Sequence, residues 1–301
     1  MRITQKMIFD DILRHTRSNR AEMARIQSSI SSGVAVRAAS QDPIAFERSR
    51  IIKDDIRKNE QYQSNISSGL RQARMAQEAL DESIDNLIEV KRILTLASSD
   101  TQGPNVRETL AGEIAGIRDN LLATLNVKYG DRHLFAGTNS ESPPFQPDVN
   151  EPGGVANYSS STPLSVRAGD NVTLDISVTG TALRDTGAQA AGGDLFGIIQ
   201  EIEQALLNDD SDTLRSLLPD VDKMVDHVTN ETARLGTSIN RLEFMFEQYE
   251  SSAILRKAEV SEMIDTDYAQ AFSDLQRNQI AFEGAMAVHS YAIRNTLMDY
   301  L

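Results

Sequence analysis

The chain has 301 residues, enough for about two domains of ordinary size, and contains neither cysteine nor tryptophan. The absence of cysteine excludes disulfides and any zinc or redox site that depends on thiolates. Apolar residues make up 40% of the chain and aromatic residues 5%, which predicts a thin aliphatic core of the kind found in helical bundles. The formal net charge of −14 argues against nucleic-acid binding, because that function needs a basic surface.

The charge is distributed unevenly along the chain. Residues 1–60 hold 12 Lys and Arg against 8 Asp and Glu, whereas residues 141–230 hold 4 against 15. The acidic middle is typical of a well-solvated outer surface, and the mildly basic N-terminal part favours pairing with the acidic C-terminal part.

No membrane-directed segment is predicted. No stretch reaches the roughly 20 apolar residues needed to span a bilayer, and residues 1–30 have no continuous apolar run of the kind a signal peptide needs. We therefore expect no membrane association. If the protein leaves the cytoplasm, it is expected to use a route other than the general secretory signal.

The first predicted element is a helix over residues 1–31. Apolar residues recur there at mostly helical spacing, and the helix should stop at Gly33, because glycine tolerates the left-handed turn that closes a helix. Residues 33–41 are expected to form a linker. Asp42 then has the properties of an N-cap, and the proline after it those of a first helical residue, so a long helix is predicted from Pro43 to about Ser98.

The residue pattern changes in the middle of the chain. Residues 101–105, with the sequence Thr-Gln-Gly-Pro-Asn, break the helical pattern, and another helix is predicted from about Val106 to Leu125. Between about residues 128 and 193, prolines and glycines interrupt short runs in which apolar and polar residues alternate. Within these runs Val172–Val178 is the clearest strand, preceded by a turn at Arg167–Asn171. This region is expected to form a small β-rich insertion.

Helix is predicted to resume near Asp194 and to continue in pieces to the C-terminus. Pro219 is expected to separate two of these pieces, because proline cannot donate a hydrogen bond inside a helix. The predicted fold class is mainly α with a small β-rich insertion: an elongated helical bundle built from N- and C-terminal segments, its termini paired as a coiled coil. Three domains are predicted, namely an inner terminal coiled coil of residues 1–40 and 265–301, a helical bundle of 41–138 and 194–264, and an outer insertion of 139–193.

The final helix is the most informative segment. From Tyr268 to Tyr300, the positions of one stripe fall at intervals that alternate four and three, the period of a helix that buries a narrow seam against other helices. Polar Gln279, His289 and Thr296 interrupt this seam. The stripe has two readings, an intramolecular coiled coil with the N-terminal helix or a contact between subunits, and we expect both uses together. The residues predicted to form this coiled-coil and subunit surface are Ile3, Met7, Ile12, Met23, Ile26, Ile30, Phe272, Leu275, Phe282, Met286, Ile293, Leu297, Tyr300 and Leu301.

Enzymatic function finds no support in the residue pattern. No phosphate-binding glycine motif and no nucleophile elbow is present. No pair at the i, i+4 spacing of a helical metal site occurs among the four histidines, His15, His133, His227 and His289. No catalytic residue, cofactor or metal site is therefore predicted.

Several acidic residues are interpreted as surface charge rather than as parts of a catalytic or metal site. Asp54 and Asp55, like Asp209 and Asp210, are adjacent, and adjacent helical residues point in directions too different to converge on one reacting atom. A calcium-binding turn is an alternative for Asp170, Asn171 and Asp175, although they lack the residue order of an EF-hand loop.

Four stretches of this chain resemble the flagellin family. Within that family, the block Leu134–Thr138 and the ending Asp299-Tyr300-Leu301 are similar to the branch that joins the bacterial flagellar hook to the filament. The four stretches are spread over nearly the full length and leave only the β-rich insertion without a recognisable match. They are Met1–Thr4 with Ile30–Gly33 and Gln41–Pro43; Gly130–Thr138 with Pro143–Phe145; Asp265–Ala269; and Leu297–Leu301.

The resemblance implies an extracellular structural subunit that is exported unfolded through the flagellar type III channel. Its expected partners are other copies of itself in a ring, a hook-side junction protein, filament flagellin, and a cytoplasmic export chaperone that holds the C-terminal helix. The terminal helices are expected to surround the export channel and the insertion to face outward. Two alternatives stay open: a short filament flagellin, and a cytoplasmic coiled-coil scaffold protein, which is a different class.

Overall fold

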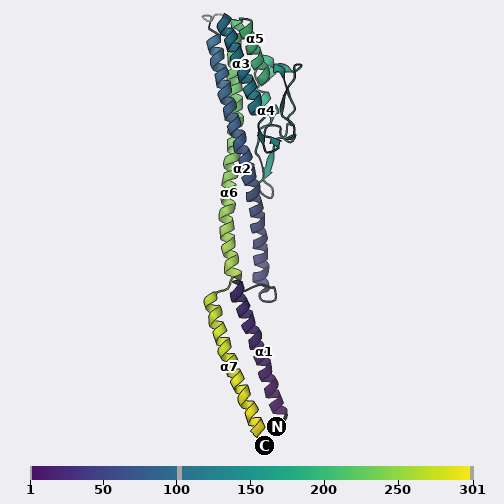
Figure 1. Ribbon diagram of the computed structural model, residues 1–301, viewed down its shortest axis with the longest axis vertical. Helices are drawn as coiled ribbons and strands as arrows, with labels where there is room; N and C mark the ends of the chain where they lie inside the picture. The colour runs from purple at the N-terminus through teal and green to yellow at the C-terminus, as the bar shows by residue number, and fades with distance from the viewer. Residues whose placement is uncertain (1, 100–103, 299–301) are drawn as a thin grey trace. The chain divides into compact units, whose positions relative to one another are not determined.

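The computed structural model describes residues 2–99 and 104–298, and the fold is mainly helical (Figure 1). The chain forms two compact units, Met1–Lys58 with Ser251–Leu301 and Asn59–Glu250. The unit boundaries fall inside two helices, α2 (Pro43–Ala97) and α6 (Ser211–Ile264). None of the described helices is long and apolar enough to cross a membrane. The fold class is confirmed as mainly α with small strand pairs, while the three-domain division stays a prediction.

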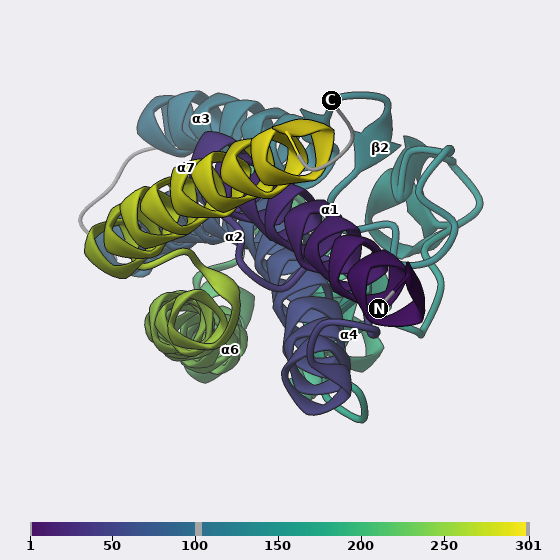
Figure 2. The same ribbon diagram turned by 90° about the horizontal axis from the view of Figure 1, so that it is seen from below.

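The first unit contains the paired terminal helices. α1 (Arg2–Ser32) and α7 (Tyr268–Met298) pack against each other and run in opposite directions (Figure 1), and Figure 2 shows the two helices crossing when seen from below. The unit also includes the beginning of α2 and the end of α6. These two segments share a small apolar cluster in which Ile56, Val260 and Ile264 are buried against Val34 and Val36.

The start of α2 follows the local sequence. Asp42 accepts hydrogen bonds through Oδ1 from the amides of Ile44 at 3.0 Å and Ala45 at 2.9 Å, and Pro43 is the first helical residue. The side chain thus satisfies amides that have no partner within the helix, an effect worth about 1 kcal/mol. The predicted cap is confirmed.

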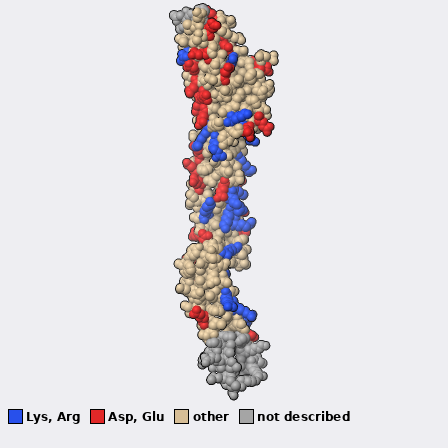
Figure 3. Space-filling model, in the orientation of Figure 1, with Lys and Arg blue, Asp and Glu red and all other residues tan. Residues whose placement is uncertain are grey.

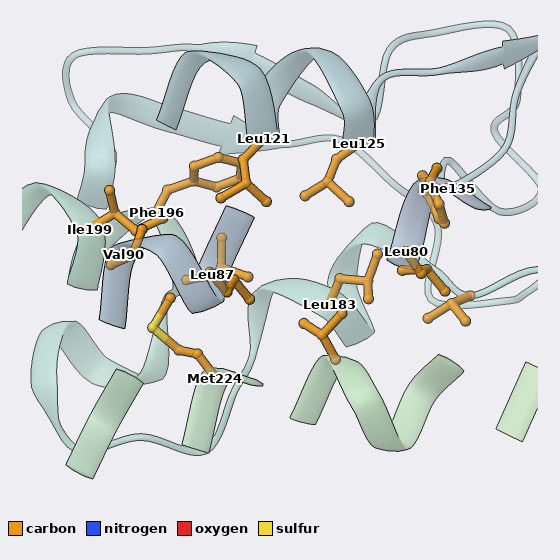
Figure 4. Packing of buried hydrophobic residues seen from close by; sticks show 14 of the residues in the cluster. Leu80, Leu87, Val90, Leu121, Leu125, Phe135, Leu183, Phe196, Ile199 and Met224 are labelled. Carbon is orange, nitrogen blue, oxygen red and sulfur yellow. The ribbon is translucent and has the colours of Figure 1, made fainter. Parts of the chain in front are cut away.

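The second unit has one aliphatic core. Side chains from α2, α3 (Pro104–Leu125), α5 (Leu195–Leu207) and α6 point toward one another in this core (Figure 4). Its buried members come mostly from positions three or four apart on each helix, as expected for helices that share a seam. They include Leu80, Leu87, Val90, Leu121, Leu125, Phe196, Ile199 and Met224.

The β-rich insertion consists of three antiparallel strand pairs among the described residues: β1 (Lys128–Tyr129) with β2 (Arg132–His133), β3 (Phe145–Pro147) with β4 (Val155–Asn157), and β5 (Ser165–Arg167) with β6 (Thr173–Asp175). The predicted strand over Val172–Val178 is therefore shorter than expected. The ladder register pairs Val166 with Leu174, and Ile176 already donates its amide outside that ladder, to the carbonyl oxygen of Leu164 at 2.8 Å.

Two tyrosines hold the turn of the β5–β6 hairpin against the long helices of its unit. The hydroxyl of Tyr62 on α2 donates to the Asp170 carboxylate at 2.7 Å, and the hydroxyl of Tyr249 on α6 donates to the Ala168 carbonyl oxygen at 2.8 Å. The hydrogen bond to Asp170 raises the pKa of Tyr62, because the neutral phenol is the donor. The helices thereby fix the position of a hairpin that is too short to be stable alone.

The prediction that Pro219 separates two helices is wrong. α5 ends at Leu207 and α6 begins at Ser211, so Pro219 lies inside α6. The break falls instead at residues 208–210, where Asp209 adopts a left-handed φ of 57°. Buried Arg107 pairs with the Asp209 carboxylate and donates to Ser211 Oγ at 2.8 Å.

Tertiary packing explains why α6 continues through its proline. An interior proline costs a helix about 3 kcal/mol through the lost hydrogen bond and the ring clash. Leu217 and Val221, on either side of Pro219, are 2% and 0% exposed. Burying two such side chains contributes about 3–6 kcal/mol, enough to offset that cost.

Asp220, on α6, forms hydrogen bonds to the loop that precedes α5. Its carboxylate accepts from the amides of Gln189 at 3.2 Å and Ala190 at 3.0 Å and from Lys223 Nζ at 3.0 Å. Burial raises the pKa of Asp220, but the hydrogen bonds from Lys223 and the two amides lower it by more, so the net pKa is below its usual value. The carboxylate therefore stabilises the fold above its unfolded pKa of about 4, and this contribution is lost as pH falls through the lower folded pKa.

We expect Asp220→Asn to lower the free energy of unfolding by about 1–3 kcal/mol at pH 7, because it weakens hydrogen bonds to a buried charged group. Urea unfolding at pH 7 and at pH 3 measures the effect, and the difference from the parent should shrink at pH 3. Asp212→Asn is the matched control, since this carboxylate on the same helix is 97% exposed. Equal losses for the two variants would contradict the role given to Asp220.

Candidate assembly surface

The end of α1 is joined by backbone hydrogen bonds to the segment between α6 and α7. The amide of Thr266 donates to the Gly33 carbonyl oxygen at 2.9 Å, and the amide of Ala35 donates to the Ile264 carbonyl oxygen at 2.7 Å. The Thr266 hydroxyl also donates to the carbonyl oxygen of Ser29 at 3.1 Å. These bonds place the first turn of α7 beside the last turn of α1.

The residues where the end of α1 meets the start of α7 are suited to tight packing. Gly33 has a left-handed φ of 74°, and a Cβ added there would lie 3.0 Å from the Tyr268 hydroxyl. Asp267 caps α7 by accepting from the Gln270 amide at 3.1 Å. Two of the sequence stretches quoted above, Ile30–Gly33 and Asp265–Ala269, come from opposite ends of the chain and meet here.

Some of the predicted surface residues lie in the seam between α1 and α7. Ile26 is 5% exposed, and the guanidinium of Arg20 lies 5.7 Å from the centre of the Phe282 ring, within reach of a cation–π interaction. The hydrogen bonds that Arg25 donates to the Glu22 carboxylate raise the pKa of Arg25, and Asp274 of α7 adds a smaller attraction. The half-buried members of the predicted set are Ile12, Met23, Ile30, Leu275 and Phe282.

Other predicted residues point away from the seam. Met7 is 65% exposed, Phe272 53% and Met286 47%. The structure therefore divides the predicted set between a seam within the chain and a surface open to solvent. The side chains of Ile3, Ile293 and Leu297, together with residues Tyr300 and Leu301, lie outside the part of the chain that the structure describes.

α7 also exposes apolar residues that the single-stripe prediction missed. Ile280 and Val288 are 71% and 59% exposed, and successive helix positions about 100° apart put them about 80° and about 160° around the helix from Phe272. The sequence contains a signal for these additional residues, because a helix that is apolar on several sides is normally buried on several sides. α1 covers only one of them, so this surface can bury more apolar area by contacting other chains.

The histidines and carboxylates form no reactive arrangement in the described part of the chain. Buried His133 has Nδ1 2.8 Å from the carbonyl oxygen of Asn126, and His227 has Nε2 2.6 Å from that of Ala182. His15 lies 3.6 Å from Asp11 on the exposed face of α1. Among the side chains that the structure describes, which do not include that of His289, no three His, Asp or Glu side chains are placed to share a metal ion.

The acidic residues singled out in the sequence instead have structural contacts. Asp54 pairs with Arg57, and Asp55 with Arg256. Asp210 accepts from the Thr213 amide at 3.1 Å and so caps α6. Asp170 accepts from Tyr62, as described above.

Two family models match the chain. Residues 3–140 match the bacterial flagellin N-terminal helical region, and residues 218–301 match the bacterial flagellin C-terminal helical region. Together the matched ranges cover more than half of the chain and include all of the α1–α7 pair except Arg2.

Several full-length proteins and solved structures are similar to this chain. Flagellar hook-associated protein 3 of Escherichia coli is 24% identical over 302 residues, with 95% of each chain covered, and that of Salmonella typhimurium is 22% identical, again with 95% of each covered. The flagellin of Bacillus subtilis is 24% identical, with 97% of this chain and 96% of the relative covered. The flagellar junction protein of Legionella pneumophila has a TM-score of 0.61 at 15% identity, with 72% of this chain and 99% of that structure covered. The FlgL structure of Bacillus cereus has a TM-score of 0.59 at 18% identity, with 70% and 98% covered. These structures share the fold.

Proposed function

Because this chain belongs to the flagellin family, we propose that it is an axial structural subunit that joins the flagellar hook to the filament. The observation that carries the proposal is the apolar surface of α7, which α1 leaves uncovered at Phe272, Ile280, Met286 and Val288. Such a surface suits a subunit whose terminal helices pack among those of its neighbours. The assigned location is the extracellular flagellum, at the hook–filament junction.

The sequence relatives favour a role at the hook–filament junction over a role in the filament. Hook-associated protein 3 of two bacteria aligns with 95% of this chain, and the Leu134–Thr138 block resembles that branch. The partners in this proposal are further copies of the chain in a ring, a hook-side junction protein and filament flagellin. A short filament flagellin is the second candidate, supported by the flagellin relative that aligns with 97% of the chain.

The proposal also assigns an export route. The subunit travels unfolded through the flagellar type III channel, and a cytoplasmic chaperone covers α7 until export. The support is again physical, since an uncovered helix with exposed Phe272 and Ile280 is prone to aggregate in the cytoplasm. The acidic residues of 141–230 suit the solvated outside of the assembled structure. No catalytic activity, cofactor or metal is assigned.

Deletion in the native bacterium tests the function. A strain lacking this chain is expected to build hooks without filaments and to release filament flagellin into the medium, with at least a tenfold loss of swimming cells. Electron microscopy of the appendages and immunoblots of the medium measure this, and a plasmid copy should restore filaments. Hooks that still carry filaments would overturn the junction role. If the deletion instead removes the main protein of the filament, the alternative that this chain is a filament flagellin is favoured.

A further inference from the structure

The first unit exposes a second set of large apolar side chains outside the terminal helices. Ile44 and Ile51 near the start of α2 are 73% and 52% exposed, and Ile254 and Leu255 near the end of α6 are 64% and 72% exposed. Neither pair belongs to the α1–α7 seam. Apolar side chains that gather on one face of a folded protein commonly mark a contact with another molecule.

Each pair lies on a helix face together with charged residues. On α2, helical spacing places Ile44, Arg48, Ile51 and Lys58 on one side, and we call these four residues the α2 face. All four are exposed, whereas Ile56 on another side is buried. Asp55 is on the same side, but its carboxylate is held by Arg256 of α6 at 2.5 Å.

The corresponding face of α6 carries the opposite charge. Exposed Ile254, Leu255, Ala258, Glu259 and Glu262 share the side opposite the buried Val260 and Ile264, and we call these five the α6 face. It combines an apolar centre with two carboxylates, and the α2 face combines an apolar centre with two cations. The two faces are therefore complementary in both hydrophobicity and charge.

The charges on both faces are available for a partner. In the described part of the chain, Arg48, Lys58, Glu259 and Glu262 form no ion pair. Their neighbours differ, since Arg50 is paired with Glu47 at 2.7 Å and Arg57 with Asp54. Figure 3 shows basic side chains gathered along this part of α2.

We propose that the α6 face of one copy binds the α2 face of the next copy. The inference rests on the proposed function, because only a chain that assembles offers the second copy. Like faces would bring like charges together, whereas unlike faces neutralise them. A contact between two different faces leaves one of each free on every pair of copies, so it propagates from subunit to subunit until a ring closes. The terminal helices and these faces are thus separate contacts in the same assembly.

Cysteine cross-linking tests the pairing directly, because the native chain contains no cysteine. A strain lacking the chromosomal copy produces two differently tagged full-length chains, Ile51→Cys and Leu255→Cys, and its sheared appendages are oxidised. We expect a cross-linked dimer carrying both tags, at least tenfold more abundant than dimers carrying one tag twice. Val149→Cys, at a side chain that is 95% exposed in the insertion, replaces either partner as the control and should give no such excess.

A charge exchange gives an independent readout. Arg48→Glu with Lys58→Glu, or Glu259→Lys with Glu262→Lys, should each reduce incorporation into appendages at least fivefold, while all four together should restore most of it. Thermal unfolding of the isolated chains should not change, since these side chains are exposed and unpaired.

The possible failures are distinct. A chain missing from the appendages in every form overturns both the proposed function and this inference. A chain that is present without the two-tag dimer, or whose combined charge variant is worse than either half, overturns this inference alone.

Discussion

A chain with Phe272→Asp and Met286→Asp is expected to fold and be exported but to fail to join the flagellum. Both side chains are about half exposed on α7, so the free energy of unfolding of the isolated chain should change by no more than about 0.5 kcal/mol for each. In the assembly each carboxylate would be buried without a partner, which costs several kcal/mol. Since about 1.4 kcal/mol corresponds to a tenfold change in binding, incorporation should fall by roughly a hundredfold or more.

The measurement is the amount of the chain in sheared appendages relative to the amount in the medium, together with swimming. Val149→Asp with Phe244→Asp is the matched control. Both of its positions are highly exposed apolar residues of the second unit, at 95% and 66%, so it introduces the same charges away from the terminal helices. Normal incorporation of the α7 variant, or an equal defect in the control, would refute the assignment of α7 as the assembly surface.

Gly153→Ala is expected to destabilise the second unit by about 2–5 kcal/mol. Gly153, in the 3₁₀ helix η1 (Pro152–Gly154), has a φ of 74°, and an added Cβ would lie 2.5 Å from the amide nitrogen of Gly197 and closer still to the Phe196 carbonyl carbon. These are backbone atoms of α5, so the clash can be relieved only by moving the helix or the loop, at about 1–3 kcal/mol. The left-handed conformation adds about 1–2 kcal/mol for alanine.

Gly154→Ala separates these two contributions. Gly154 has a φ of 68°, but a Cβ there would meet no atom within 4 Å, so only the conformational cost of about 1–2 kcal/mol applies. Urea unfolding followed by circular dichroism compares the two variants. If Gly153→Ala lowers the free energy of unfolding by less than Gly154→Ala does, η1 does not pack against α5 as described.

Helix ends were predictable where the signal is local. Asp42 and Pro43 start α2, and Gly33 follows the last turn of α1 with a left-handed φ, because capping depends on atoms a few residues apart. The start of α3 was predicted less well, at Val106 instead of Pro104. Proline favours the first turn of a helix, and the prediction had assigned it to the preceding break.

Pro219 and Asp209 show where local rules are insufficient. Proline predicts a helix end, yet the helix continues, and the real break occurs at a non-glycine residue with positive φ. The deciding contacts are distant in sequence, since Arg107 reaches Asp209 from α3. Pattern reasoning has no access to such pairs.

The sequence by itself determined the α-rich class, the capped helices, the β-rich interruption and the presence of an apolar stripe at each end of the chain. These properties depend on the spacing and chemistry of nearby residues, which the sequence states directly. Only the tertiary structure decided which of the stripe residues pack between α1 and α7 and which face solvent. It also revealed the exposed residues of α2 and α6 that the stripe did not include. Burial depends on which helices become neighbours, and that choice minimises the exposed apolar area of each packed unit rather than of any single segment.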